Sequence, residues 1–124
     1  MSEIERCEDK IEKVCGQRTR LFRPPKGMWD GDTFLAAKAA GYRIILWSLA
    51  LERHTARTPE AMAQRVLGKV RPGMIILAHD GELFHPVPRE KTMQALPLLV
   101  EGLQKQGYRL VTIPELLRLG KEER

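Results

Sequence analysis

A few side chains in this sequence could take part in a single reaction. Each lies at, or directly after, the end of a segment with the pattern of a strand. His79 and Asp80 come directly after the apolar run of residues 74–78, and Arg23 ends a short strand-like segment just before the turn at residues 24–27, PPKG. An arginine can hold a carboxylate with two hydrogen bonds, the backbone N–H groups of a tight turn can stabilise an oxyanion, and an imidazole can protonate a leaving group. Together these groups would suit a reaction in which an oxyanion forms and a leaving group departs.

Strands of a parallel sheet are expected to position these residues. Residues 74–78, MIILA, are apolar without alternation, which is typical of a strand buried on both faces between helices. Such folds place their chemistry at the carboxyl ends of the strands. We therefore expect Arg23, the residues after Trp47, and His79 to share one rim. Each motif, taken alone, has a competing structural interpretation. His79 and Asp80 could be caps at a strand end, Arg23 a surface cation, and PPKG an ordinary turn.

Helices and strands alternate along the rest of the chain. Helices are predicted over about 3–15, from Asp30 or Asp32 to Ala39, from Thr58 to about 70, over 89–106, and from Pro114 to Leu119. Strands are predicted over 21–23, 42–49, 74–78 and 108–112. This order predicts an α/β fold of about four parallel strands with right-handed connections. Four strands are few, so an edge strand such as 21–23 needs another chain or segment to cover it.

Length and composition limit the classes of function. The 124 residues are enough for one domain, with 43% hydrophobic and 30% charged residues, and no apolar run approaches the roughly 18 residues of a membrane span. The first residues are charged and amphipathic, unlike a secretory signal, so the chain as written is expected in the cytoplasm. The formal charge is +5, but basic residues are scattered among acidic ones without interleaved aromatic residues, so nucleic-acid binding is not expected.

Three spaced motifs resemble one known family. RPPKG at residues 23–27 resembles an R-P-P-[YFRH]-G motif, Trp47 lies at the position of a Trp motif, and LAHD at residues 77–80 resembles an L-x-H motif. The family is that of the metal-dependent polysaccharide deacetylases of the NodB homology type, carbohydrate esterase family 4, and the resemblance covers essentially the whole chain. The run WSLA at residues 47–50 is closest to the sporulation-type branch, which deacetylates muramic acid residues in peptidoglycan.

The resemblance implies both a fold and a reaction. The fold is a distorted (β/α) barrel of the glycoside hydrolase/deacetylase type, of which residues 1–124 would be the C-terminal portion. The reaction is hydrolysis of the non-peptide C–N bond of N-acetylated sugars in peptidoglycan or chitooligosaccharide. In it, Arg23 would orient the catalytic carboxylate, the backbone N–H of Lys26 would face the oxyanion, and His79 would protonate the departing amine. Trp47 and Leu77 would wall the acetyl pocket.

The family's metal-binding motifs are missing from this sequence. An F-D-D segment and an H-x-x-x-H segment precede the arginine motif in the family, but the 22 residues before Arg23 contain neither. We therefore predict no metal ligands in this chain, and the family's zinc-like divalent ion would belong to an N-terminal part outside it. A makeshift metal enzyme using His79, Asp80 and His85 is the least favoured alternative, because His54, His79 and His85 lack the family's spacing.

A second departure concerns the support of His79. Where the family usually has an Asp that supports the catalytic imidazole, this sequence has Arg53. A carboxylate beside an imidazole favours its charged form and a cation disfavours it. His79 is therefore expected to lack its usual partner.

Two hypotheses concern what the chain does alone, and the first of them is the leading one. In the first, it is the C-terminal half of a deacetylase domain, from a split gene, a truncated clone or a half-domain that pairs with a partner. It would then be inactive alone, and extracellular or in the cell wall if it is part of a longer exported protein. In the second, it is a catalytically dead half-barrel that dimerises through its open edge. That half-barrel would bind sugar weakly through Trp47 and the basic rim Arg20, Arg23 and Lys26.

Overall fold

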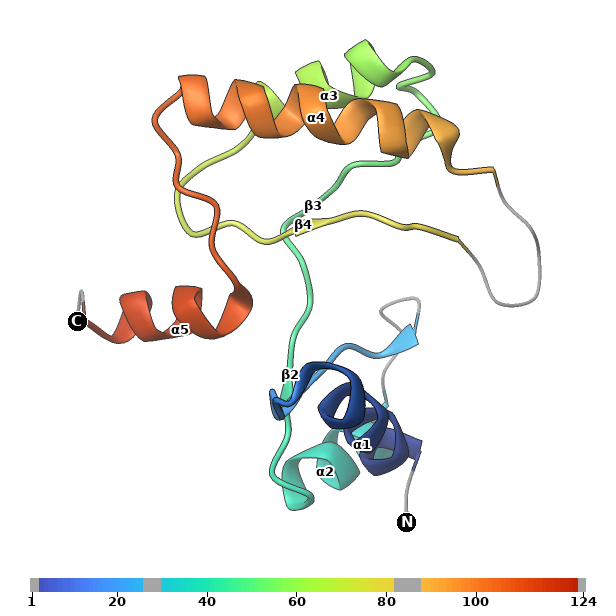
Figure 1. Cartoon of the computed structure of the whole chain (residues 1–124), viewed down its shortest axis with the longest axis vertical. Coiled ribbons are helices and arrows are strands. Elements are labelled where there is room, and N and C mark those ends of the chain that lie inside the picture. The colour runs from blue at the N-terminus through green and yellow to red at the C-terminus, as the bar shows by residue number, and fades with distance from the viewer. Residues whose placement is uncertain (1–2, 26–29, 82–87, 123–124) are drawn as a thin grey trace. The chain divides into compact units, whose positions relative to one another are not determined.

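Two compact units make up the computed structural model, which describes residues 3–25, 30–81 and 88–122. The first unit spans Met1–Leu46 and the second spans Trp47–Arg124 (Figure 1). Each unit contains one pair of short parallel strands. Within the described parts of the chain, no helix is long and apolar enough to cross a membrane.

The N-terminal unit alternates helix and strand. Its elements are α1 (Glu3–Cys15), β1 (Leu21–Phe22), α2 (Gly31–Ala39) and β2 (Arg43–Ile44). β1 and β2 pair in parallel, and the N–H of Ile45 donates to the carbonyl of Phe22 at 2.8 Å, which continues the ladder past β2. Helix α2 begins as predicted, because the Asp30 carboxylate accepts the N–H of Thr33 at 2.8 Å.

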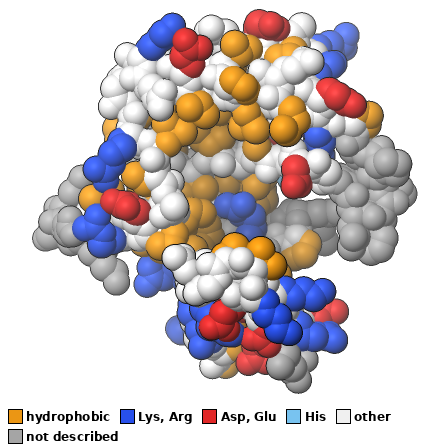
Figure 2. All heavy atoms as spheres, in the orientation of Figure 1, with side chains coloured by type: hydrophobic (Ala, Val, Ile, Leu, Met, Phe, Trp, Pro, Cys, Tyr) orange, Lys and Arg blue, Asp and Glu red, His pale blue; other side chains and the backbone are white. Residues whose placement is uncertain are grey.

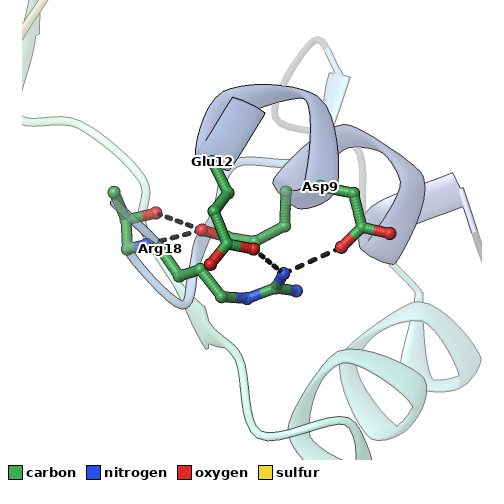
Figure 3. A network of polar contacts seen from close by, with 5 residues as sticks. Asp9, Glu12 and Arg18 are labelled. Atoms are coloured by element: carbon green, nitrogen blue, oxygen red, sulfur yellow. Dashed lines mark hydrogen bonds and ion pairs between the residues drawn. The ribbon is translucent and has the colours of Figure 1, made fainter. Parts of the chain in front are cut away.

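Side-chain contacts tie the segment after α1 back to that helix. Nη1 of Arg18 donates to Asp9 at 2.8 Å and to Glu12 at 2.6 Å (Figure 3). The hydrogen bonds to Asp9 first, and then to Glu12, hold the pKa of Arg18 above its ordinary value. Glu8 is 2% exposed and accepts the N–H of Thr19. These bonds fix the chain just before β1, and Arg23, the first residue of the arginine motif, directly follows that strand. Acidic and basic side chains are intermingled on the face of this unit that Figure 2 shows.

The C-terminal unit is built around a strand, helix, strand sequence. Its elements are β3 (Leu49–Ala50), α3 (Pro59–Leu67), β4 (Ile76–Leu77), α4 (Glu90–Lys105) and α5 (Ile113–Glu122). β3 and β4 pair in parallel, with Ala50 opposite Leu77. Helix α3 lies between these strands in the sequence and begins as predicted, since Thr58 accepts the N–H of Ala61 at 3.0 Å and Pro59 follows it.

The hydrophobic core of this unit lies between α3 and α4, which run side by side in Figure 1. The core residues are Leu51, Met62, Ala63, Val66, Ala95, Leu99 and Leu103. Close approach of the two helices depends on Gly102, because a Cβ there would lie 2.5 Å from Cδ1 of Leu67. The core therefore sets the position of the first turn of α4, where a buried polar residue lies.

The helices agree with the sequence prediction better than the strands do. The strand predicted over 42–49 is wrong as a single element, because it is present as β2 and β3, which pair with different partners. The strand predicted over 108–112 is also wrong, since no described residue forms a ladder with it. Instead Tyr108 packs against the core, and its hydroxyl donates to the carbonyl of Val70 at 3.3 Å. The described residues form four short strands, in two separate parallel pairs.

Candidate functional site

His79 follows β4 by two residues, and its partner, Glu52, follows β3 by two residues. Oε1 of Glu52 lies 2.8 Å from Nδ1 of His79, and Oε2 accepts the backbone N–H of His79 at 3.1 Å. Because Ala50 and Leu77 are opposite each other in a parallel pair, the residues two positions further along each strand are also opposite. The register of the strands therefore places a carboxylate beside the imidazole.

The end of β3 is held in place just before Glu52. The N–H of Leu51 donates to the carbonyl of Leu77 at 2.8 Å. The guanidinium of Arg65, on α3, donates to the carbonyls of Ala50 and Leu51. Bonds from two neighbouring elements thus fix the backbone that carries the carboxylate.

Thr92 provides a third hydrogen bond to the same carboxylate. It lies in the first turn of α4, is 3% exposed, and its hydroxyl Oγ1 lies 2.9 Å from Oε2 of Glu52. Glu52 therefore accepts bonds from the His79 ring, the His79 backbone and the Thr92 hydroxyl. Both oxygens of the Glu52 carboxylate therefore accept hydrogen bonds.

The charge of Glu52 determines which ring nitrogen of His79 carries the proton. Burial acts to raise the pKa of the Glu52 carboxyl, but hydrogen bonds from His79 and Thr92 outweigh it and hold that pKa below its ordinary value of 4.5. An ionised carboxylate only accepts hydrogen bonds, so Nδ1 of His79 is the donor. The other nitrogen, Nε2, is left to exchange a proton with a ligand. His79 is accessible for this, since 44% of its side chain is exposed.

A pocket of about 260 Å³ lies beside the carboxylate. Its lining includes Glu52 and Thr92 together with the basic side chains Arg53, Arg89 and Lys91. Basic groups therefore outnumber the carboxylate in this lining. A ligand that carries hydroxyl or anionic groups suits it.

The arginine motif lies in the N-terminal unit. Arg23 directly follows β1 and is exposed, whereas Pro24, the next residue, is fully buried. Lys26 lies outside the described residues. Within the predicted basic rim, the Arg20 guanidinium lies over the Tyr42 ring, 5.5 Å from its centroid. The rim predicted for Arg23 and Lys26 stays a prediction.

Trp47 and Leu77 lie at different ends of the β3–β4 pair. Trp47 is half-buried and precedes β3 by two residues, whereas Leu77 is buried and is the last residue of β4. In a parallel pair, Leu77 is therefore on the carboxyl side, close in sequence to His79. The acetyl-pocket roles of Trp47 and Leu77 stay predictions, and so does a common rim for Arg23 and His79.

The sequence analysis missed Glu52 and Thr92. The expectation that His79 lacks a carboxylate partner is wrong, because Glu52 fills that role one residue before Arg53. The available signal was positional, since Glu52 and His79 each follow a strand by two residues. Thr92 had a weaker signal, because its spacing from Ala95 puts it on the buried face of α4.

The described residues do not fit a hydrolytic metal centre. Within residues 3–25, 30–81 and 88–122, no three His, Cys, Asp or Glu side chains are grouped to hold a metal ion. Such a centre needs about three protein ligands. Of the alternative ligand set His79, Asp80 and His85, the last lies outside the described residues. These described residues therefore offer no ligand set for the divalent metal that the resemblance implies.

Comparisons with known proteins point to one family. Residues 1–45 match the family model described as polysaccharide deacetylase. The chain is 40% identical over 100 residues to the peptidoglycan-N-acetylglucosamine deacetylase of Bacillus cereus, which is 79% of this chain and 45% of that protein. It is 32% identical over 112 residues to the chitooligosaccharide deacetylase of Sinorhizobium fredii, which is 85% of this chain and 52% of that protein.

A solved structure extends the likeness to the fold. The peptidoglycan deacetylase PdaC from Bacillus subtilis matches with a TM-score of 0.78 and 28% identity, over 98% of this chain and 55% of that chain. The chain thus spans about half the length of the curated relatives named above. Members of this family are generally metal-dependent and have a NodB-type (β/α) barrel, with which the short parallel strands and helices are consistent. The chain belongs to the polysaccharide deacetylase family, carbohydrate esterase family 4.

Proposed function

We propose that this chain supplies the proton-donating side of a deacetylase for N-acetylated glycans. Water adds to the acetyl carbonyl carbon, and the C–N bond breaks with its electron pair moving to nitrogen. A base takes a proton from the attacking water, and the departing nitrogen takes a proton from Nε2 of His79 in its doubly protonated form, which gives acetate and a free amino sugar. The Glu52–His79 contact of 2.8 Å supports the proposal, because the carboxylate accepts from Nδ1 and so orients the ring with Nε2 free to face a ligand.

The remaining roles are carried over from the family. Arg23 would orient a catalytic carboxylate, and the backbone N–H of Lys26 would face the oxyanion. Trp47 and Leu77 would wall the acetyl pocket. In the family a divalent metal activates the water, and the described residues offer no ligand set for it. We propose that a complementary polypeptide carrying the F-D-D and H-x-x-x-H motifs supplies both the ligands and the base.

The substrate is proposed to be peptidoglycan or chitooligosaccharide. Relatives that match this chain are named for both substrates. The WSLA run at residues 47–50 favours the sporulation-type branch and therefore N-acetylmuramic acid residues. Action on that polymer would take place at the cell wall.

Acetate release tests the proposal. The chain is mixed with the N-terminal part of a related deacetylase and with zinc, and acetate is measured with peptidoglycan and with chitooligosaccharide. We expect release from the mixture, loss with His79→Gln, and little change with Gln104→Ala, an exposed position on α4. A mixture that forms a stable complex with bound zinc and still releases no acetate contradicts the proposal. So does full activity of His79→Gln.

A second candidate is a catalytically inactive module that dimerises or binds sugar. The lack of a metal-ligand group among the described residues favours it, as do the two-stranded ladders, since a pair of strands alone leaves outer edges unpaired. Light scattering and glycan titration test this candidate. A monodisperse monomer that binds no glycan would exclude it.

A further inference from the structure

Thr92 uses its hydroxyl in an unusual way for a helical threonine. In helices a threonine hydroxyl often bonds to the carbonyl three or four residues earlier. The hydroxyl of Thr92 instead lies 2.9 Å from Oε2 of Glu52, 40 residues away in the sequence. The residue is 3% exposed, so this polar group is buried.

The direction of this hydrogen bond follows from the charge of its partner. Glu52 is an acceptor because its carboxyl is ionised, and the single hydroxyl proton of Thr92 therefore points to Oε2. The bond is charge-assisted, which makes it stronger than a bond between neutral groups. It does not cap α4, whose first residues receive no side-chain cap from Arg89.

The bond bears on how the carboxylate faces the imidazole. Oε2 accepts from Thr92 and from the His79 backbone, while Oε1 faces Nδ1 of the His79 ring. Two donors on Oε2 fix the rotation of the carboxylate about its last side-chain bond. With the Thr92 donor removed, one donor on Oε2 is left, so the carboxylate can move away from Nδ1 and the tautomer with its proton on Nε2 becomes accessible.

We infer that Thr92 is a positioning residue that fixes the Glu52 carboxylate so that His79 keeps its proton on Nδ1 and presents Nε2 for proton transfer. The structural part of this inference stands on the contacts, and its catalytic consequence rests on the proposed function. The Thr92 hydrogen bond thereby connects the Glu52–His79 pair to the first turn of α4. The core between α3 and α4 holds that turn in place.

Variants at Thr92 in the full chain test the structural part. Thr92→Val keeps the shape and removes the donor, and Thr92→Ser keeps the donor. Nitrogen-15 NMR of the His79 ring is expected to show the Nδ1–H tautomer in the wild type and in Thr92→Ser, and a mixture of tautomers in Thr92→Val. The titration midpoint of the Glu52 carboxyl should move to higher pH in Thr92→Val only, because a donor to the charged form is lost.

A matched control separates positioning from folding. Thr112→Val makes the same chemical change at an exposed threonine whose hydroxyl accepts the N–H of Glu115 at 3.4 Å, so it weakens the start of α5 but should leave both signals unchanged. If Thr92→Val does not fold, Thr92→Cys replaces it, since a thiol of similar size is a weak donor. A folded Thr92→Val or Thr92→Cys with wild-type tautomer and wild-type Glu52 titration overturns the inference.

The catalytic consequence has its own readout in the reconstituted mixture. Thr92→Val should lower kcat about tenfold with KM unchanged, and Thr92→Ser should restore it, as expected for a lost bond to a charged group. Unchanged kcat in an active mixture overturns the catalytic part. If no variant, including the wild type, releases acetate, the proposed function fails, and the NMR result still decides the role of Thr92.

Discussion

Glu52 holds His79 at two points, with one carboxylate oxygen 2.8 Å from ring atom Nδ1 and the other accepting the backbone N–H at 3.1 Å. A side chain held only through its ring could swing with its loop. Here the carboxylate fixes both the ring and the main chain that carries it. Since the two residues are 27 positions apart, the contact also joins the ends of β3 and β4.

Glu52→Gln should weaken the fold as well as the proposed reaction. The amide has the shape of the carboxylate but lacks its charge, so the bonds from His79 and Thr92 are no longer charge-assisted. We expect the free energy of unfolding to fall by about 1–2 kcal/mol, the difference between hydrogen bonds to a charged group and to a neutral one. Urea unfolding at pH 7 measures it. Glu101→Gln is the matched control, because Glu101 and its partner Lys105 are both largely exposed, and an equal loss there would contradict a specific role for Glu52.

The stability contributed by Glu52 should depend on pH in the acid range. The pKa of Glu52 in the folded chain lies below its ordinary value of 4.5, so the unfolded chain binds the proton more readily. The contribution is therefore complete above pH 4.5 and is lost as the pH falls through the folded-state pKa. The difference in unfolding free energy between wild type and Glu52→Gln should shrink from pH 7 to pH 3. A difference that stays constant over this range would show that the charge contributes nothing.

Gly102→Ala should destabilise the C-terminal unit. A methyl group at this position would lie 2.5 Å from Cδ1 of Leu67, so α3 and α4 must move apart or Leu67 must change rotamer. Cδ1 and Cδ2 of Leu67 are the end of a flexible, half-buried side chain and alanine favours the helix over glycine, so we expect a loss at the low end of the range for overpacked cores, about 1 kcal/mol. Thermal or urea unfolding measures it. Gly120→Ala on α5, where nothing lies within 4 Å of an added Cβ, should be neutral or slightly stabilising.

The start of α3 gives a test of the predicted cap. Thr58→Ala removes the oxygen that accepts the N–H of Ala61, and Thr58→Ser keeps it. The alanine variant should lose about 1 kcal/mol of stability and the serine variant much less. Equal losses would mean that the methyl group of Thr58, rather than its hydroxyl, matters.

Helix ends could be predicted because their signals are local. Asp30 and Thr58 each lie directly before a helix, and both accept the N–H expected of a cap. The strands were harder, because strand propensity does not specify a partner. Residues 42–49 have a continuous strand pattern, but the hydrogen bonds go first to the segment of β1 and then to that of β4.

Prediction of the site from the sequence has the same limit, because strand partners are not specified locally. His79 could be found from one segment, since it follows an apolar run and completes an L-x-H motif. Its carboxylate could not, because the choice between positions 52 and 53 depends on the register between β3 and β4. The contact between Thr92 and Glu52 depends on the packing of α4 as well, so it could be identified only from the structure.

Glu52, His79 and Thr92 all lie within one continuous stretch of sequence. It runs from Leu49 at the start of β3 to Thr92 in the first turn of α4. Gene recombination between family members could therefore exchange the three side chains together, if both crossovers fall outside residues 49–92. A crossover between residues 52 and 79 would instead join a carboxylate from one parent to an imidazole from another. Chimaeras of that second kind can keep the contact only where both parents place the carboxylate at the same position in the strand register.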